Sequence, residues 1–140
     1  MKQYIVIGCG RFGSSLATTM NLLGHQVMAI DKNEEIIQNL SDKVTHVAAV
    51  DVTDEYALRS LGLGNFDVAI IAIGSDIRAS IMATLIAKEM GVEQVVCKAK
   101  DELQAKVLYK IGADRVVFPE RDMGIRVAHN LVSDNILDHI

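Results

Sequence analysis

Tryptophan is absent from this sequence of 140 residues, proline occurs once, and aromatic residues make up only 4%. The two cysteines, Cys9 and Cys97, lie far apart and form no Cys-x-x-Cys pair. This spacing excludes a disulfide framework and a zinc site built from paired cysteines. Such low cysteine use fits a protein of the reducing cytoplasm.

Long runs of positive charge and long apolar runs are missing as well. Eighteen acidic against fourteen basic residues give a net charge of −4, so nucleic acid is not an expected partner. The longest apolar run, residues 68–73, is far shorter than the roughly 20 residues that cross a membrane. Residues 1–4 lead directly into an apolar strand, without an export signal. We therefore expect a soluble, cytoplasmic chain.

Apolar runs alternate with helical patterns along the whole chain, and half of the residues are hydrophobic. We expect strands at 3–8, 26–31, 46–50, 67–74, 94–99 and 115–118. Helices are expected at 11–23, 34–40, 53–62, 76–90 and 102–111. This alternation predicts an α/β fold, a Rossmann-like doubly wound parallel sheet with strand order 3-2-1-4-5-6.

A last helix is expected at about 122–140, where apolar residues recur at every fourth position: Ala128, Val132, Ile136 and Ile140. We divide the chain into a nucleotide-binding lobe, residues 1–119, and a crossover or dimerisation helix, residues 120–140. The apolar stripe packs on another subunit or on a further domain, or else back on its own lobe.

The first strand runs into a Gly-x-Gly-x-x-Gly turn, Gly8 to Gly13. In this setting Gly8 allows the tight turn, Gly10 lets the backbone approach a phosphate, and Gly13 lets the helix pack close to the strand. An anion there also meets the positive end of the helix dipole. The turn therefore predicts a nucleotide site.

Acidic residues close the next two strands. Asp31 follows Gly13 by 18 residues and is placed to accept hydrogen bonds from an adenosine ribose, although it could instead cap the following helix. The acid would repel a 2′-phosphate such as that of NADP, although Lys32 beside it weakens this repulsion. Asp51, or the backbone of Val52, could meet the adenine edge, and a purely turn-forming Asp51 is an equal alternative.

Arg11 stands inside the phosphate turn, where a guanidinium adds a charge-assisted contact to phosphate oxygens. We infer a third phosphate, or a phosphate of a neighbouring subunit, unless Arg11 is merely solvated. No catalytic pattern accompanies the turn: there is no Gly-Lys-Ser/Thr loop, and no Tyr-x-x-x-Lys pair. We expect a nucleotide-binding protein that is not an enzyme.

Several segments resemble the RCK (KTN, or TrkA-N) domain, most closely the Ktr-type cytosolic regulatory subunits of bacterial potassium uptake systems. They are Gly8-Cys9-Gly10-Arg11-Phe12-Gly13, Asp31-Lys32-Asn33, Ala72-Ile73-Gly74, Lys98-Ala99, Ile111-Gly112-Ala113-Asp114-Arg115 and Pro119-Glu120-Arg121-Asp122-Met123-Gly124. The last two blocks are the most specific.

The resemblance implies a homodimer that assembles into an octameric ring under a membrane potassium-translocating subunit, at the inner face of the cell membrane. It implies ATP and ADP as ligands, with NAD(H) as the alternative because Trk-type members are associated with it. A small NAD-dependent oxidoreductase or a redox-sensing module is the competing interpretation. We expect this chain to lack the C-terminal lobe of such subunits, as either a truncated form or a short family member.

By position, the resemblance assigns Arg11 to a γ-phosphate at the dimer interface, Asp31 to the ribose, Lys98 to the nucleotide side of the fifth strand, and Glu120 to a divalent cation near ATP. The nucleotide site predicted from all of these arguments has thirteen members: Gly8, Gly10, Arg11, Phe12, Gly13, Asp31, Lys32, Asp51, Val52, Ala72, Ile73, Gly74 and Lys98.

Overall fold

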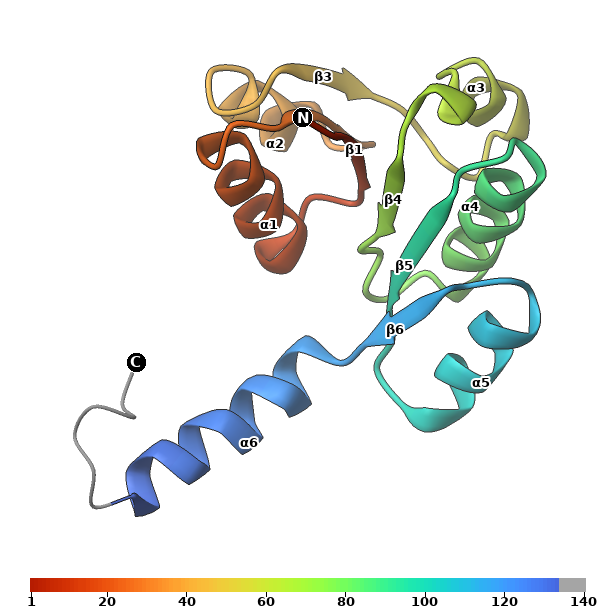
Figure 1. Ribbon diagram of the computed structural model, residues 1–140. Helices are drawn as coiled ribbons and strands as arrows, with labels where there is room; N and C mark the ends of the chain where they lie inside the picture. The colour runs from red at the N-terminus through yellow and green to blue at the C-terminus, as the bar shows by residue number, and fades with distance from the viewer. Residues whose placement is uncertain (134–140) are drawn as a thin grey trace.

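A single parallel sheet of six strands organises the computed structural model, which describes residues 1–133 (Figure 1). The strand order β3-β2-β1-β4-β5-β6 confirms the predicted doubly wound topology. Its elements are β1 (Gln3–Ile7), α1 (Arg11–Leu22), β2 (Gln26–Asp31), α2 (Glu34–Leu40), β3 (His46–Ala49), α3 (Glu55–Arg59), η1 (Leu63–Asn65), β4 (Val68–Ile71), α4 (Ile77–Glu89), β5 (Gln94–Lys98), α5 (Glu102–Lys110), β6 (Arg115–Val117) and α6 (Pro119–Val132).

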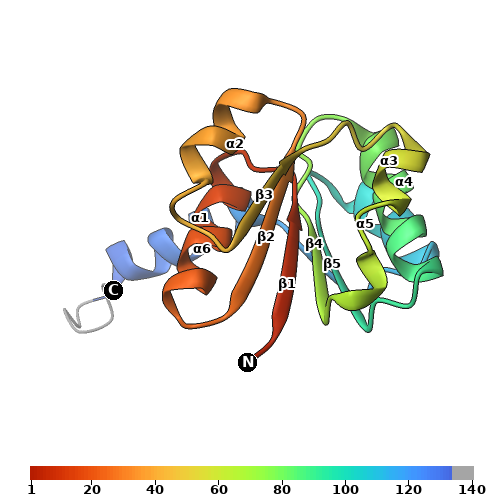
Figure 2. The same cartoon turned by 90° about the horizontal axis from the view of Figure 1, so that it is seen from above.

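Helices cover both faces of the sheet, which explains why its strands are apolar on both sides (Figure 2). On one face, Ile5, Ile7 and Ile71 pack in the core formed with α3, α4 and α5. On the other face, Val6 and Ile70 pack in a second core, to which α1 and α2 contribute. Successive residues of one strand point to opposite faces, so β1 and β4 each supply both cores.

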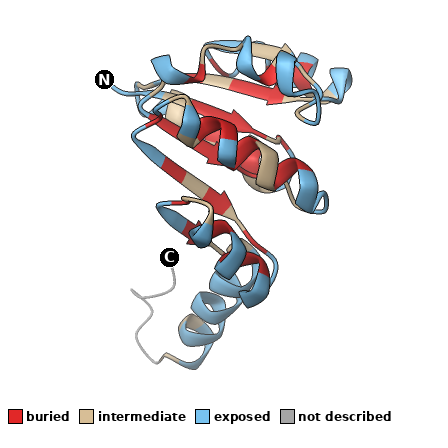
Figure 3. Cartoon of the chain, turned by 90° about the vertical axis from the view of Figure 1, so that its right-hand side faces the viewer, coloured by how far each residue is buried: buried red, intermediate tan, exposed pale blue. Residues whose placement is uncertain are grey.

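Helix α6 departs from this layered arrangement. It begins at Pro119 rather than near residue 122, because a proline is well suited to the first helical position, and it ends at Val132. No residue of α6 is buried, whereas the sheet is (Figure 3). Leu131 and Val132 are 77% and 82% exposed, so the expected apolar stripe does not pack back on its own lobe within the described residues. Ile136 and Ile140 lie outside them.

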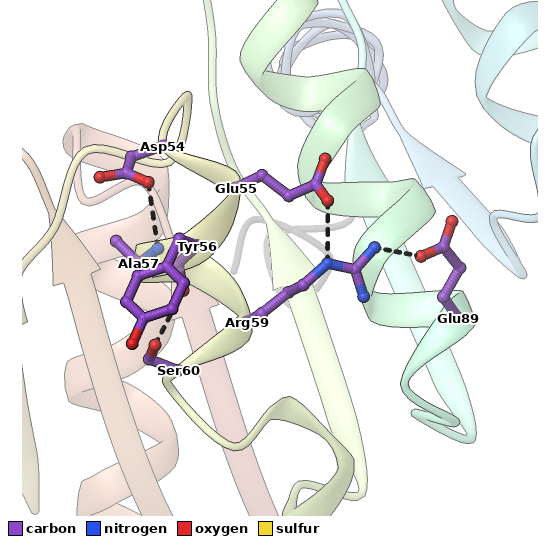
Figure 4. A network of polar contacts seen from close by, with 7 residues as sticks. All are labelled: Asp54, Glu55, Tyr56, Ala57, Arg59, Ser60 and Glu89. Carbon is purple, nitrogen blue, oxygen red and sulfur yellow. Dashed lines mark hydrogen bonds and ion pairs between the residues drawn. The ribbon is translucent and has the colours of Figure 1, made fainter.

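Ion pairs of one arginine join the surface helix α3 to α4. Helix α3 is much shorter than the expected 53–62 and is followed by the separate turn η1. The Arg59 guanidinium joins it to the end of α4, donating to Glu55 at 3.0 Å and to Glu89 at 2.5 Å (Figure 4). All three side chains are exposed to solvent, so these ion pairs contribute little to the stability of the fold.

No helix in residues 1–133 has the length and apolar composition that a membrane crossing requires.

At Gly13, helix α1 packs closely against the end of β1 and the turn that follows it. A Cβ atom at this position would lie 2.0 Å from the Gly8 carbonyl oxygen, a separation that real atoms do not adopt. Gly124 offers the opposite case within a helix, because a Cβ there meets no atom within 4 Å.

We predict that Gly13→Ala lowers the free energy of unfolding by about 2 to 3 kcal/mol, since overpacking forces α1 away from β1. Gly124→Ala is the matched control and should stabilise its helix by about 0.5 to 1 kcal/mol, because alanine has the better helix propensity. Chemical denaturation monitored by circular dichroism measures both. Equal stabilities of the wild type and Gly13→Ala would contradict the close packing.

Candidate functional site

A cleft of about 530 Å³ opens at the carboxyl ends of the strands. It straddles the point where β1 and β4 are neighbours and the chain crosses to opposite faces, which is where open α/β sheets bind ligands. Each lining segment follows the end of a strand, and together they are Gly8–Gly10, Asp31–Lys32, Val50–Thr53, Ala72–Asp76 with Ala79, Lys98–Lys100 and Phe118–Arg121.

The glycine turn has the geometry expected of a phosphate cradle. Gly8 has φ +97°, and a Cβ there would lie 3.0 Å from the Ala72 carbonyl group, so both its conformation and its surroundings favour glycine. Gly10 is the N-cap of α1, and a Cβ there would meet nothing within 4 Å. Gly10 lines the cleft, and no side chain caps α1, so the first N–H groups of the helix have no side-chain capping partner. An anion beside Gly10 can approach them.

Asp31 ties the end of β2 to the glycine turn. Its Oδ2 accepts from the Cys9 backbone N–H at 2.8 Å, and its Oδ1 accepts from the Asn33 N–H at 2.9 Å. The cap of α2 is Asn33, whose side chain accepts from Glu35 and Ile36, so the alternative of Asp31 as the cap is wrong. Each carboxylate oxygen keeps lone-pair capacity for a further donor, such as a ribose hydroxyl.

Asp51 forms a turn of its own. Its Oδ1 accepts from the Thr53 N–H at 3.0 Å and from the Thr53 hydroxyl at 2.7 Å. These hydrogen bonds from Thr53 lower the pKa of Asp51, so the side chain is ionised at neutral pH. Asp51 thus stabilises a turn, and Asp51 and Val52 also line the cleft, so a contact with adenine stays a prediction.

Lys98 brings a positive charge to the cleft. Its Nζ lies beside Gly74 in the segment after β4, where a Cβ on Gly74 would be 3.3 Å away. Within residues 1–133, Lys98 forms no ion pair, so its charge is available to an anion in the cleft. Glycine at position 74 leaves room for the ammonium group between β4 and β5.

Not all predicted site residues meet in this cleft. Arg11, Phe12 and Gly13 belong to the first turn of α1 but do not line it. Gly13 is buried for packing, Phe12 packs on the core beneath α1, and Arg11 is exposed. The placement of Arg11 outside its own cleft leaves it accessible to another molecule.

The wall formed by Phe118, Pro119 and Arg121, together with Lys100, was missed by sequence reasoning. The signal that could have identified it is position, because residues after β5 and β6 reach the same edge as those after β1. Glu120, predicted for a divalent cation, lies in this wall. The described residues contain no group of three His, Cys, Asp or Glu able to hold a metal, so a cation here would need ligand oxygens from elsewhere.

Cys9 occupies the turn as a buried structural residue. Its side chain is 1% exposed, and its thiol donates to the Ile30 carbonyl at 3.4 Å. Burial, followed by the nearby charge of Asp31, raises the pKa of Cys9 to about 12. Burial also raises the pKa of Cys97 to about 11, although its contact with the Thr84 hydroxyl acts in the opposite direction.

We predict that neither thiol reacts in the native protein at pH 8. With a pKa of about 12, only about one Cys9 thiol in ten thousand is ionised at that pH, and the thiolate is the reactive form. Iodoacetamide labelling followed by mass spectrometry should modify no cysteine before denaturation and both afterwards. Rapid modification of the native protein would contradict the burial of these side chains.

Comparisons with known sequences agree on one family for this chain. The sequence model of the TrkA-N domain matches residues 4–119. Ktr system potassium uptake protein C from Bacillus subtilis (strain 168) is 48% identical over 139 residues, covering 99% of this chain and 63% of that protein. Ktr system potassium uptake protein A from Vibrio alginolyticus is 46% identical over 137 residues, covering 98% and 62%. The chain thus spans less than two thirds of the length of these relatives.

Solved structures show the same fold at low identity. The TrkA-N domain of the inner membrane protein YbaL from Escherichia coli superposes with a TM-score of 0.81 at 16% identity, covering 94% of this chain and 97% of that one. The GsuK channel bound to NAD gives 0.71 at 15% identity, covering 83% and 21%, and GsuK bound to ADP gives 0.70 at 15%, covering 83% and 31%.

Proposed function

Because this chain belongs to the TrkA-N domain family, we propose that it is a nucleotide-binding regulatory part of a potassium uptake system. In this proposal ATP and ADP compete for the cleft, and the bound nucleotide changes the arrangement of a dimer or ring that gates a membrane potassium-translocating subunit. The observation that supports it best is a cleft with an open glycine turn in a chain 48% identical to a potassium uptake protein.

The lining residues suit an adenine nucleotide. Asp31 and Asp51 follow β2 and β3, on one side of the glycine turn, and would hold the adenosine. Lys98 follows β5, on the other side, and would neutralise phosphate charge. The phosphates would meet the N-terminus of α1 between them, where the helix dipole and free N–H groups stabilise an anion.

Discrimination between ATP and ADP requires a contact that only one of them makes, since equal contacts shift no equilibrium. Arg11 is our proposed source of that contact. It is exposed and outside its own cleft, so it would reach the γ-phosphate held by a facing subunit. Glu120 in the cleft wall would share a divalent cation with the phosphate oxygens of ATP, which supply the ligands that the chain lacks.

Helix α6 supports an assembled form. The side chains of Ile125, Val127, Leu131 and Val132 are each at least 45% exposed. We propose that this helix packs on a second subunit, in a homodimer that builds a larger ring, octameric in the family. Residues 1–119 are the nucleotide lobe in this proposal, and the part of the relatives that extends beyond this chain would form a further lobe.

A second candidate is an NAD(H)-binding redox-sensing module or a small NAD-dependent oxidoreductase. The structure of GsuK bound to NAD favours it, because that protein has the same fold. The names of the relatives, which describe potassium uptake proteins, favour the regulatory role over catalysis.

Titration of the purified protein with ATP, ADP, NAD and NADH separates the two candidates. We expect isothermal calorimetry to give lower dissociation constants for ATP and ADP than for either dinucleotide, because charged groups line both sides of the phosphate turn. A clear preference for NADH would favour the second candidate. Hydride transfer to any acceptor would contradict a purely regulatory role. If none of the four nucleotides binds, both candidate functions are wrong.

Two substitutions should distinguish the contacts made to both ATP and ADP from those made only to ATP. Asp31→Ala is expected to weaken ATP and ADP alike, by about 1.5 to 3 kcal/mol, the usual worth of hydrogen bonds to a charged group. Arg11→Ala should weaken ATP far more than ADP. Arg115→Ala is the matched control, because Arg115 begins β6 at the opposite edge of the sheet. Equal losses of ATP and ADP binding in Arg11→Ala would contradict the proposed γ-phosphate contact.

A further inference from the structure

The first turn of α6 forms part of the cleft wall and also attaches the helix to the rest of the lobe. Phe118, the N-cap of α6, is 9% exposed and belongs to the larger core. Its N–H donates to Asp122 Oδ2 at 3.3 Å, which fixes the start of the helix. Beyond this turn α6 extends away from the sheet with no buried residue (Figure 1). The direction of α6 therefore depends on the contacts of its first turn.

Arg121 makes the main polar contact between this turn and the lobe. Its guanidinium lies over the Phe118 ring, 3.7 Å from the centroid, and one of its nitrogens donates to Glu102 at 2.5 Å. Glu102 is the first residue of α5, and its side chain is 80% exposed. A second, longer contact of 3.8 Å joins Arg121 to Asp122 in the same turn. Arg121 is itself half exposed and lines the cleft.

Arg121 lies on the side of the glycine turn toward which the successive phosphates of a bound nucleotide would extend. The acids proposed for adenosine follow β2 and β3, and the glycine turn follows β1. A chain of phosphates leaving that turn then passes over β4 and β5, where Lys98 lies, toward β6. Three strand spacings of about 4.8 Å separate β1 from β6, and the long arginine side chain reaches back from the far side.

We propose that Arg121 is a further ligand-contacting residue, which exchanges Glu102 for the anionic end of the bound nucleotide. This inference rests on the nucleotide-binding function proposed above. The stacking on Phe118 holds the planar guanidinium at the cleft wall in both states, so the exchange needs only a change of hydrogen-bond acceptor. It gives the nucleotide a direct contact with the helix that leaves the lobe.

The exchange is energetically accessible because the existing ion pair is exposed and therefore weak. A terminal phosphate carries more charge than a carboxylate and forms the stronger charge-assisted hydrogen bonds with a guanidinium. Glu102 and the ligand are competitors in this arrangement. Removal of Glu102 should consequently strengthen ligand binding. If the Arg121–Glu102 ion pair were purely structural, its removal would weaken ligand binding or leave it unchanged.

The test is a double-mutant cycle on ATP affinity, measured by isothermal calorimetry on the full chain. Glu102→Gln should bind ATP about two- to fivefold more tightly, the range that an exposed ion pair supports. Arg121→Ala should bind ATP about tenfold more weakly, from the loss of a charge-assisted hydrogen bond. In the Arg121→Ala background, Glu102→Gln should have no effect, because its benefit acts only through Arg121.

Controls separate this exchange from general electrostatics and from misfolding. Glu89→Gln breaks an exposed pair with Arg59 (Figure 4) that has the same 2.5 Å length. Neither residue lines the cleft, so this variant should leave ATP affinity unchanged. AMP, whose single phosphate ends at the glycine turn, should bind wild type and Glu102→Gln equally. Thermal unfolding of each variant reports whether it folds.

Two results would overturn the inference while wild-type ATP binding persists. The first is an unchanged or weaker ATP affinity in Glu102→Gln. The second is a gain in affinity that remains in the Arg121→Ala background, which would be a general charge effect. Failure of the wild type to bind any adenine nucleotide would instead remove the proposed function itself, so the two failures are distinguishable.

Discussion

The close approach of α1 to the edge of the sheet is the constraint on which the rest of the cleft depends. A side chain at Gly13 would overlap the Gly8 carbonyl, and one at Gly8 would crowd Ala72 of the neighbouring strand end. With both absent, α1 can begin beside the turn, and its N-cap residue Gly10 lines the cleft. The charge of the helix end falls off within one turn, so the distance from the helix end decides whether the site can attract an anion.

The parallel topology then gathers the remaining groups. Residues after β2, β3, β4, β5 and β6 are far apart in the chain, yet they line one cleft because every strand ends at the same edge. Asp31 shows how closely structure and site are joined here, since its carboxylate supports the glycine turn through the Cys9 N–H and remains available to a ligand. The same carboxylate, together with burial, keeps the Cys9 thiol neutral.

Helix α6 departs from the layers of the lobe. It buries none of its residues, and its first turn joins it to the lobe through Phe118 and Arg121. That turn is also a wall of the cleft. Occupation of the cleft and the attachment of the apolar helix therefore involve the same few side chains, which is the physical basis for proposing that a nucleotide acts on an assembly of subunits.

Local sequence determined the strands, the helices and their order, because apolar runs, glycine turns and helix caps act over a few residues, and the family follows from the same motifs. It also placed the glycine turn, Asp31, Asp51, Gly74 and Lys98 at the ends of strands, where the cleft lies. Only the tertiary structure decided which of the predicted residues meet. Arg11 and Phe12 are neighbours of the turn in sequence but lie outside the cleft, since a helix turns its side chains about its axis. Arg121 and Glu102 are distant in sequence and meet only in the folded protein, because β6 brings the start of α6 beside the start of α5.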